Sequence, residues 1–205
     1  MAQIVSNINN HELEIISLYL SDYKREIHVR EIARLLNANH RTIGLTVEKL
    51  KEKQVMNLKK IGKNNVYSLN IQNITTREYI TCAESLQKIK ILEKHFFFKK
   101  LLTELSQIIE TEPIVLFGSY AKGKETKESD IDILLFKGET EIEAKIKSIA
   151  KQYNKSIQVQ QATREQFETG IWEKDPLIIE IVNNHIILNN NQFFIGMLWR
   201  YAHER

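Results

Sequence analysis

Residues that interrupt or cross-link a fold are scarce in this chain. Its 205 residues include two prolines, seven glycines and one cysteine, Cys82. A single cysteine cannot form a disulfide within the chain, which excludes a small secreted fold built on disulfides. The low proline and glycine contents favour regular helices and strands over disorder. We expect Cys82 to be a small buried apolar side chain.

Long apolar segments and a secretion signal are also lacking. No run approaches the roughly 18 apolar residues that a membrane-spanning helix needs. The amino-terminal residues show no basic stretch followed by an apolar one, as a signal peptide would. From these absences we expect a cytoplasmic protein with no membrane partner.

The net charge of +3 is small, but the positive charge is concentrated in one segment. Residues 21–67 contain 11 Lys and Arg against 5 Asp and Glu, a local net charge of +6. A basic stretch within an otherwise balanced chain is typical of proteins that bind nucleic acid.

The most informative pattern lies between two apolar runs of strand length. Residues 114–123 are Ile-Val-Leu-Phe-Gly-Ser-Tyr-Ala-Lys-Gly, and residues 129–136 are Ser-Asp-Ile-Asp-Ile-Leu-Leu-Phe. Residues two apart in a strand point to the same face, so Asp130 and Asp132 present two carboxylates side by side. A divalent cation such as Mg²⁺ would relieve the repulsion between them.

The turn before the carboxylates suits a phosphate. Gly118 lets the backbone approach a ligand closely, Ser119 adds a hydroxyl, and the amides of the turn can surround negative charge. A Gly-Ser pair alone is usually a plain turn, and two alternating aspartates alone are usually a solvated strand end. The two together, in this order between two apolar strands, indicate a nucleotide site.

Phe117-Gly118-Ser119, ten further residues and then Asp130-Ile-Asp-Ile133 resemble the signature of the polymerase-β-type nucleotidyltransferases. The small prokaryotic branch, the minimal nucleotidyltransferases, is the most similar. The resemblance covers the motif directly and residues 110–205 by the order of elements. It implies transfer of a nucleoside monophosphate from a triphosphate, with ATP expected, using Mg²⁺. By position, Asp130 and Asp132 would be the catalytic metal ligands, and Gly118 and Ser119 would bind the nucleotide.

One departure from that signature bears on catalysis. The family usually supplies a third carboxylate from a later strand, where it helps to activate the acceptor hydroxyl. The matching strand, residues 156–161, offers only Gln158 and Gln160, and an amide can neither take a proton nor bind a metal as a charged ligand. Glu180 could be recruited from a predicted helix, but a solvated or capping role is as plausible there.

Two functions therefore stay open. The chain is a nucleotidyltransferase acting on an unknown acceptor, such as a protein, a tRNA or a small molecule. Alternatively, it is a DNA-binding regulator whose nucleotidyltransferase-like domain binds a nucleotide without transferring it.

Residues 11–70 resemble a winged helix-turn-helix domain of prokaryotic regulators, by their order of helix, helix-turn-helix and hairpin. Apolar spacing and turn residues predict the elements listed by range: helices at 11–21, 30–36 and 40–53, and strands at 55–60 and 65–69. Asn39 is the expected N-cap of the third helix. The resemblance implies binding of double-stranded DNA, with that third helix in the major groove.

Six residues are the candidate DNA contacts. Arg41 and Thr42, near the start of the third helix, would reach base edges. The basic residues that would contact phosphates are Lys49, Lys59, Lys60 and Lys63. The alternative is a protein-binding module with a solvated basic face.

The segment between these two regions is predicted to be helical. Residues 76–109 contain no glycine or proline, and their apolar residues recur at helical spacing, with a break expected near His95. The apolar stripe could pack on the chain's own domains or pair with a second copy to form a homodimer.

The expected fold class is α+β or α/β. It consists of an amino-terminal winged helix-turn-helix domain (1–75), a long helical connector (76–109) and a small nucleotidyltransferase fold with a mixed sheet and flanking helices (110–205).

Overall fold

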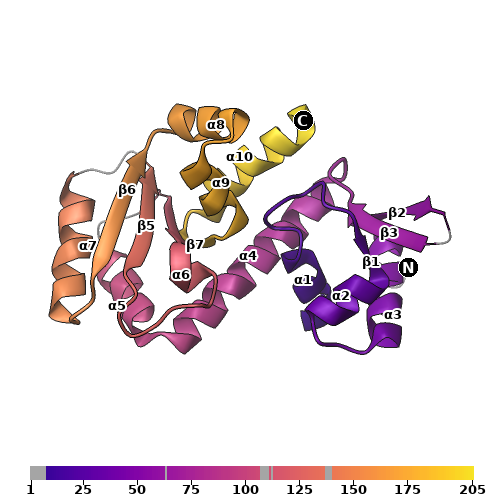
Figure 1. Cartoon of the computed structure of the whole chain (residues 1–205), viewed down its shortest axis with the longest axis horizontal. Helices are drawn as coiled ribbons and strands as arrows, with labels where there is room; N and C mark the ends of the chain where they lie inside the picture. The colour runs from indigo at the N-terminus through magenta and orange to yellow at the C-terminus, as the bar shows by residue number, and fades with distance from the viewer. Residues whose placement is uncertain (1–7, 63, 107–110, 112, 137–139) are drawn as a thin grey trace, which may run out of the picture. The chain divides into compact units, whose positions relative to one another are not determined.

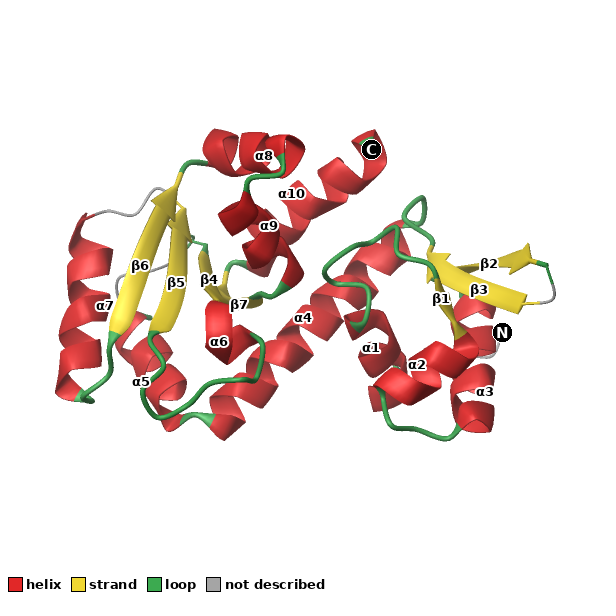
Figure 2. Cartoon of the chain, viewed as in Figure 1, coloured by secondary structure: helices red, strands yellow, loops and turns green. Residues whose placement is uncertain are grey.

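The computed structural model of the chain describes residues 8–62, 64–106, 111, 113–136 and 140–205 (Figure 1). The chain divides into two compact units, one formed by Met1–Ala83 with Ala202–Arg205 and the other by Glu84–Tyr201. The boundaries fall within two helices, α4 (Ile74–Lys94) and α10 (Asn191–Glu204). Each unit has a sheet of its own (Figure 2).

The first unit combines short helices with a three-stranded antiparallel sheet. In chain order its elements are α1 (Asn10–Ser17), β1 (Ile27–His28), α2 (Val29–Leu35), α3 (His40–Glu52), β2 (Met56–Ile61) and β3 (Asn64–Leu69). Strand β3 lies between β1 and β2, and β2 and β3 form the predicted hairpin. The first helix ends at Ser17, earlier than predicted, and its N-cap is Asn9, whose side chain accepts from the backbone N–H of Glu12.

Helix α3 agrees with its prediction. The side chain of Asn39 accepts from the backbone N–H groups of Arg41 and Thr42, which satisfies two donors that the first turn leaves unpaired. Its buried residues, spaced at helical intervals, are Ile43, Thr46, Val47 and Leu50. The helix therefore packs inward along one stripe and leaves its first turn open to solvent.

The predicted long helical segment breaks where expected. Helix α4 ends at Lys94, α5 (Phe96–Leu105) begins two residues later, and His95 between them has an extended backbone (φ −129°, ψ 103°). Phe97 and Phe98 are buried, whereas Phe96 is 62% exposed. Cys82 is half-buried rather than fully buried.

The second unit is built on a mixed four-stranded sheet. Its strands are β4 (Ile114–Phe117), β5 (Ile131–Phe136), β6 (Ile157–Ala162) and β7 (Ile186–Asn189), in the order β6-β5-β4-β7. Strands β5 and β6 are parallel, while β4 is antiparallel to both β5 and β7. The helices are α5, α6 (Gly118–Ala121), α7 (Thr140–Gln152), α8 (Arg164–Glu173), α9 (Pro176–Asn183) and parts of α4 and α10. The predicted mixed sheet with flanking helices is confirmed.

Helices cover both faces of this sheet (Figure 1). On one face, alternate strand residues pack against α5 and α7 in a single buried cluster that includes Leu116, Ile133 and Phe98. On the other face, the ring of Phe136 contacts Phe167 of α8 and Phe194 of α10, with centroids 5.2 and 6.2 Å apart. Because Asp132 and Phe136 alternate with Ile133 along β5, the aspartates belong to the second face.

None of the helices, over the ranges that the structure describes, is both long and apolar enough to cross a membrane.

Candidate functional site

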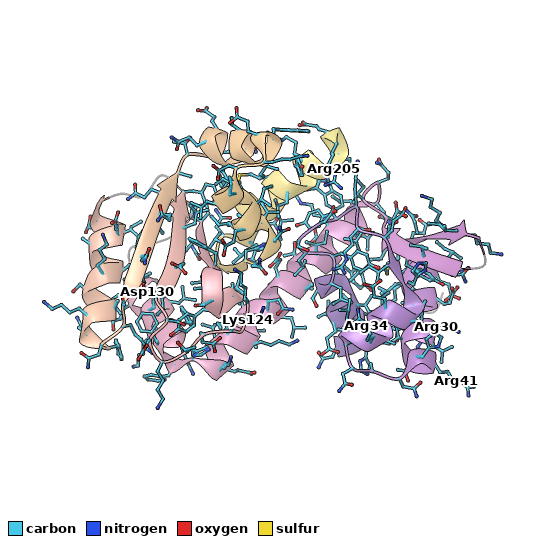
Figure 3. All side chains as sticks on the ribbon, in the orientation of Figure 1. Arg30, Arg34, Arg41, Lys124, Asp130 and Arg205 are labelled. Carbon is cyan, nitrogen blue, oxygen red and sulfur yellow. The ribbon has the colours of Figure 1, made fainter. Side chains whose placement is uncertain are left out.

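Four strand ends meet at one edge of the sheet in the second unit. Because β4 is antiparallel to β5 and β7, and β5 is parallel to β6, the carboxyl end of β4 lies beside the amino ends of the other three strands. This edge collects Gly118 after β4, the two aspartates at the start of β5, and Gln158 at the start of β6. Figure 3 shows Asp130 at this end of β5.

Position 118 requires a glycine for two reasons, its backbone conformation and the closeness of Asp132. Its φ of +69° lies in the left-handed region, and a Cβ there would lie 2.1 Å from Oδ2 of Asp132. The carboxylate of Asp132 therefore rests directly against the Gly-Ser turn. Ser119 follows in α6, a helix of only four residues, so individual amides rather than a helix dipole would favour an anion here.

The environments of the two aspartates shift their pKa values in opposite directions. Hydrogen bonds from the side chains of Ser156 and Gln158 hold the pKa of Asp130 below its ordinary value. Burial raises the pKa of Asp132, and the negative charges of Asp130 and Glu180 raise it further. Asp132 therefore carries a negative charge that its surroundings do not fully compensate.

Gln158 lies beside the aspartate pair, as the motif alignment requires. It is the residue of β6 that pairs with Asp132, and its Nε2 donates to Oδ2 of Asp130 at 2.9 Å. Gln160 lies two residues after Gln158 on the same face of β6 and pairs with Leu134, so it is further from the aspartates. The position at which the resemblance led us to expect an acid thus holds a neutral donor that binds the first aspartate.

An ion pair flanks the aspartates on the opposite side. Nζ of Lys122, which ends α6, lies 2.7 Å from Oε1 of Glu180 on α9. Glu180 raises the pKa of Asp132 and Lys122 opposes that shift. Sequence reasoning gave Glu180 either a substitute-acid role or a solvated or capping role, and it missed Lys122, whose place three residues after Ser119 was the available signal.

The loop between the Gly-Ser turn and the aspartates is anchored to the junction of α4 and α5. Glu125, which is only 10% exposed, pairs with Lys94, and its Oε1 lies 3.0 Å from Nε2 of His95. The ring of His95 in turn packs edge-on against Tyr120 of α6, with centroids 5.3 Å apart. These contacts, absent from the sequence-based prediction, restrain the loop that leads to Asp130.

Residues 98–188 match the family model described as "Nucleotidyltransferase domain". The matched range runs from α5 to β7 and contains all four strands and both parts of the motif. Residues 98–188 are a nucleotidyltransferase domain.

Two similar proteins were also found. "Putative protein adenylyltransferase MJ1379" of Methanocaldococcus jannaschii is 47% identical over 53 residues, which cover 25% of this chain and 47% of that protein. The matching region thus spans about half the length of this curated relative. A solved structure, "Crystal structure of the toxin-antitoxin with AMP-PNP", is 17% identical with a TM-score of 0.38, covering 52% of this chain and 84% of that chain.

The donor set of the nucleotidyltransferase domain fits a divalent cation. Nucleotidyltransferases typically use a nucleoside triphosphate and a divalent metal. Within the part of the chain that the structure describes, no three His, Cys, Asp or Glu side chains are grouped closely enough to hold a metal ion by themselves. Mg²⁺, however, is commonly held by one or two carboxylates together with substrate phosphates. Asp130 and Asp132 supply such a pair, and the raised pKa of Asp132 marks charge that a cation would neutralise.

The candidate DNA contacts lie in the first unit. Arg41, Thr42 and Lys49 are exposed on α3, and Lys59 and Lys60 are exposed on β2. Nζ of Lys59 pairs with Glu26 at 3.0 Å. Lys63 lies outside the described residues.

An open groove of about 1000 Å³ in the first unit is lined in part by one of these candidates, Arg41. Its lining includes Arg30 and Arg34 of α2 and Arg41 of α3, all three of which Figure 3 labels. Sequence reasoning did not select Arg30 and Arg34, although their spacing of four residues places them on one face of α2 and could have indicated them.

We expect Gly118→Ala to destabilise the second unit more than Gly123→Ala does. The φ values of the two glycines are +69° and +64°, so each alanine costs about 1–2 kcal/mol of backbone strain. Only at Gly118 does the new Cβ meet another atom, Oδ2 of Asp132, and such overlap typically costs about 1–3 kcal/mol more. Urea denaturation followed by circular dichroism measures the difference, and equal losses would show that Asp132 moves aside freely.

We expect Asp132→Asn to raise the Tm of the metal-free protein by a few degrees at pH 7. The pKa of Asp132 is higher in the folded chain than in the unfolded chain, so its ionised form disfavours folding at neutral pH. This penalty disappears as the pH falls through the folded-state pKa, and the two proteins should melt alike below about pH 4.

Asp130→Asn is the matched control, because the pKa of Asp130 is lowered and its ionised form favours folding at neutral pH. This variant should not gain stability. Melting curves in a chelator from pH 3 to 8 test both statements, and a lower Tm for Asp132→Asn at pH 7 would contradict the first.

Proposed function

We propose that this chain is a Mg²⁺-dependent nucleotidyltransferase that transfers a nucleoside monophosphate, AMP from ATP, to an acceptor hydroxyl. The observation that carries the proposal is the same-face pair Asp130 and Asp132, with Asp132 against Gly118, within a matched nucleotidyltransferase domain. Two same-face carboxylates beside a Gly-Ser turn suit a cation and a triphosphate bound next to each other.

In this reaction the acceptor hydroxyl oxygen attacks the α-phosphorus and gives up its proton to solvent, while the bond to the β-phosphate oxygen breaks and pyrophosphate leaves. The amides after Gly118 and the hydroxyl of Ser119 bind the triphosphate. Asp130 and Asp132 would hold Mg²⁺, which would supply positive charge to stabilise the attacking and leaving oxygens. Gln158 keeps Asp130 in place through its hydrogen bond of 2.9 Å, but it cannot take the proton of the acceptor.

A protein hydroxyl is the acceptor that we propose. The support is the Methanocaldococcus jannaschii relative, whose name describes adenylyl transfer to a protein. The match covers 47% of that relative.

We further propose that residues 1–75 are a winged helix-turn-helix domain that binds double-stranded DNA through residues 11–70. Its support is the capped helix α3 with Arg41 exposed in its first turn, the hairpin of β2 and β3, and the local net charge of +6 over residues 21–67.

In this division residues 76–109 are the connector and residues 110–205 the transferase domain. The exposed Ile89 and Phe96 are where a second copy would pack. A protein that uses ATP and DNA would work in the cytoplasm.

Two observations favour a second function. Gln158 stands where a third acid is usual, and the described residues hold no three-ligand metal cluster. A chain without a proton acceptor in the site would bind Mg²⁺ and ATP and regulate DNA binding without transferring AMP.

The two functions differ in whether label is transferred. We expect the protein, incubated with Mg²⁺, cell lysate and ATP labelled at the α-phosphate, to attach label to a macromolecule. Attachment of label from the γ-phosphate should not exceed that in lysate alone, because in this transfer the γ-phosphate leaves with pyrophosphate. Asp130→Asn should lose the transfer, by at least about 100-fold if it removes a metal ligand, while Glu173→Gln on the exposed end of α8 should not. Tight binding of Mg·ATP with no transfer would favour the regulator.

Binding of DNA should fall steeply as salt rises, because neutralised phosphates release counterions. We expect Lys60→Ala to weaken binding to all sequences alike and to reduce the salt slope by about 1, whereas Arg41→Ala should change the preferred sequence. Selection from a random-sequence library followed by salt titration tests this, with Lys174→Ala as a control from the other unit. No binding at low salt would favour the protein-binding alternative.

A further inference from the structure

Helix α9 carries one charged side chain, and it faces the candidate site. The helix is Pro-Leu-Ile-Ile-Glu-Ile-Val-Asn, in which Glu180 is the sole ionisable residue. Asp175 caps the helix through the backbone N–H groups of Leu177 and Ile178, so Glu180 is not needed as a cap. The helix leads directly into β7, whose first residue lies beside the end of β4. Glu180 therefore has a position at the site edge and no evident role in the helix itself.

Lys122 connects Glu180 to the Gly-Ser turn. The backbone N–H of Lys122 donates to the carbonyl of Gly118 at 3.1 Å, while its Nζ lies 2.7 Å from Oε1 of Glu180. One end of this residue is thus fixed to the turn that would hold the triphosphate. The other end is a partly exposed ammonium on a flexible stem, which can exchange one anionic partner for another.

The charges at this edge do not balance. Asp130, Asp132 and Glu180 contribute three carboxylates, and Lys122 is the cation that both pairs with Glu180 and acts on Asp132. A triphosphate bound at the turn brings several further negative oxygens within reach of Lys122. If Lys122 turns to those oxygens, Glu180 loses its partner beside an aspartate and a bound cation.

We propose that Glu180 is the third carboxylate of this site, released from Lys122 when Lys122 pairs with the bound triphosphate, and that it then joins Asp132 in holding the divalent cation. The inference rests on the proposed function. It explains how the site can dispense with an acid on β6, since Gln158 lies on the β6 side of β5 and Glu180 approaches from the side of β4 and β7. It also explains why no three-ligand cluster exists among the described residues while Glu180 is paired with Lys122.

The proposal predicts opposite effects for the two partners of the ion pair. We expect Glu180→Gln to reduce Mn²⁺ affinity about tenfold in the presence of a non-hydrolysable ATP analogue, and to change it less than about twofold without the analogue. Lys122→Met should raise Mn²⁺ affinity without the analogue, because Glu180 is then free, and should weaken binding of the analogue. Glu180→Asp, which keeps a carboxylate, should recover part of the loss.

The experiment is Mn²⁺ titration of the full chain by electron paramagnetic resonance, with and without the analogue, after melting curves have shown that each variant is folded. Glu173→Gln, an exposed substitution on α8, is the matched control. If Glu180 merely anchors Lys122, both variants will weaken analogue binding and leave Mn²⁺ affinity at the control value, which overturns this inference alone. A wild-type protein that binds neither Mn²⁺ nor the analogue overturns the proposed function as well.

Discussion

The repulsion between two carboxylates at the start of β5 is the constraint on which this site depends. Alternation along the strand places Asp130 and Asp132 on one face, where neither can move far from the other. Hydrogen bonds from Ser156 and Gln158 stabilise the first carboxylate. The second lies against Gly118, where burial and neighbouring negative charge raise its pKa. The site is thus short of positive charge, which the proposed divalent cation would supply.

The surrounding fold keeps that arrangement from relaxing. Helices pack on both faces of the sheet, so β5 cannot twist to separate its aspartates without disturbing buried residues such as Ile133 and Phe136. The loop before Asp130 is restrained through Glu125, which contacts the junction of α4 and α5. Because Gln158 is neutral, the β6 side of the site has no carboxylate of its own. In our proposal Glu180, on the other side, supplies the third carboxylate.

Local features of this protein were predictable because they depend on residues a few positions apart. Asn39 caps α3, since an N-cap needs only the backbone N–H groups two and three residues ahead. The break at His95 and the alternation of β5 follow from periodicity in the same way. The burial of individual side chains was less predictable from the sequence. Leu35, the apolar last residue of α2, is 41% exposed.

By itself the sequence determined the Gly-Ser turn, the aspartate pair, the order of helices and strands, and the basic character of residues 21–67. Tertiary structure alone decided which distant groups meet them. Lys122 and Glu180 are 58 positions apart, and Gln158 and Asp130 are 28 apart. Those contacts follow from the strand order β6-β5-β4-β7, which brings one end of each strand to the same edge. No local pattern encodes that order, because it is set by the packing of both sheet faces against helices from distant parts of the chain.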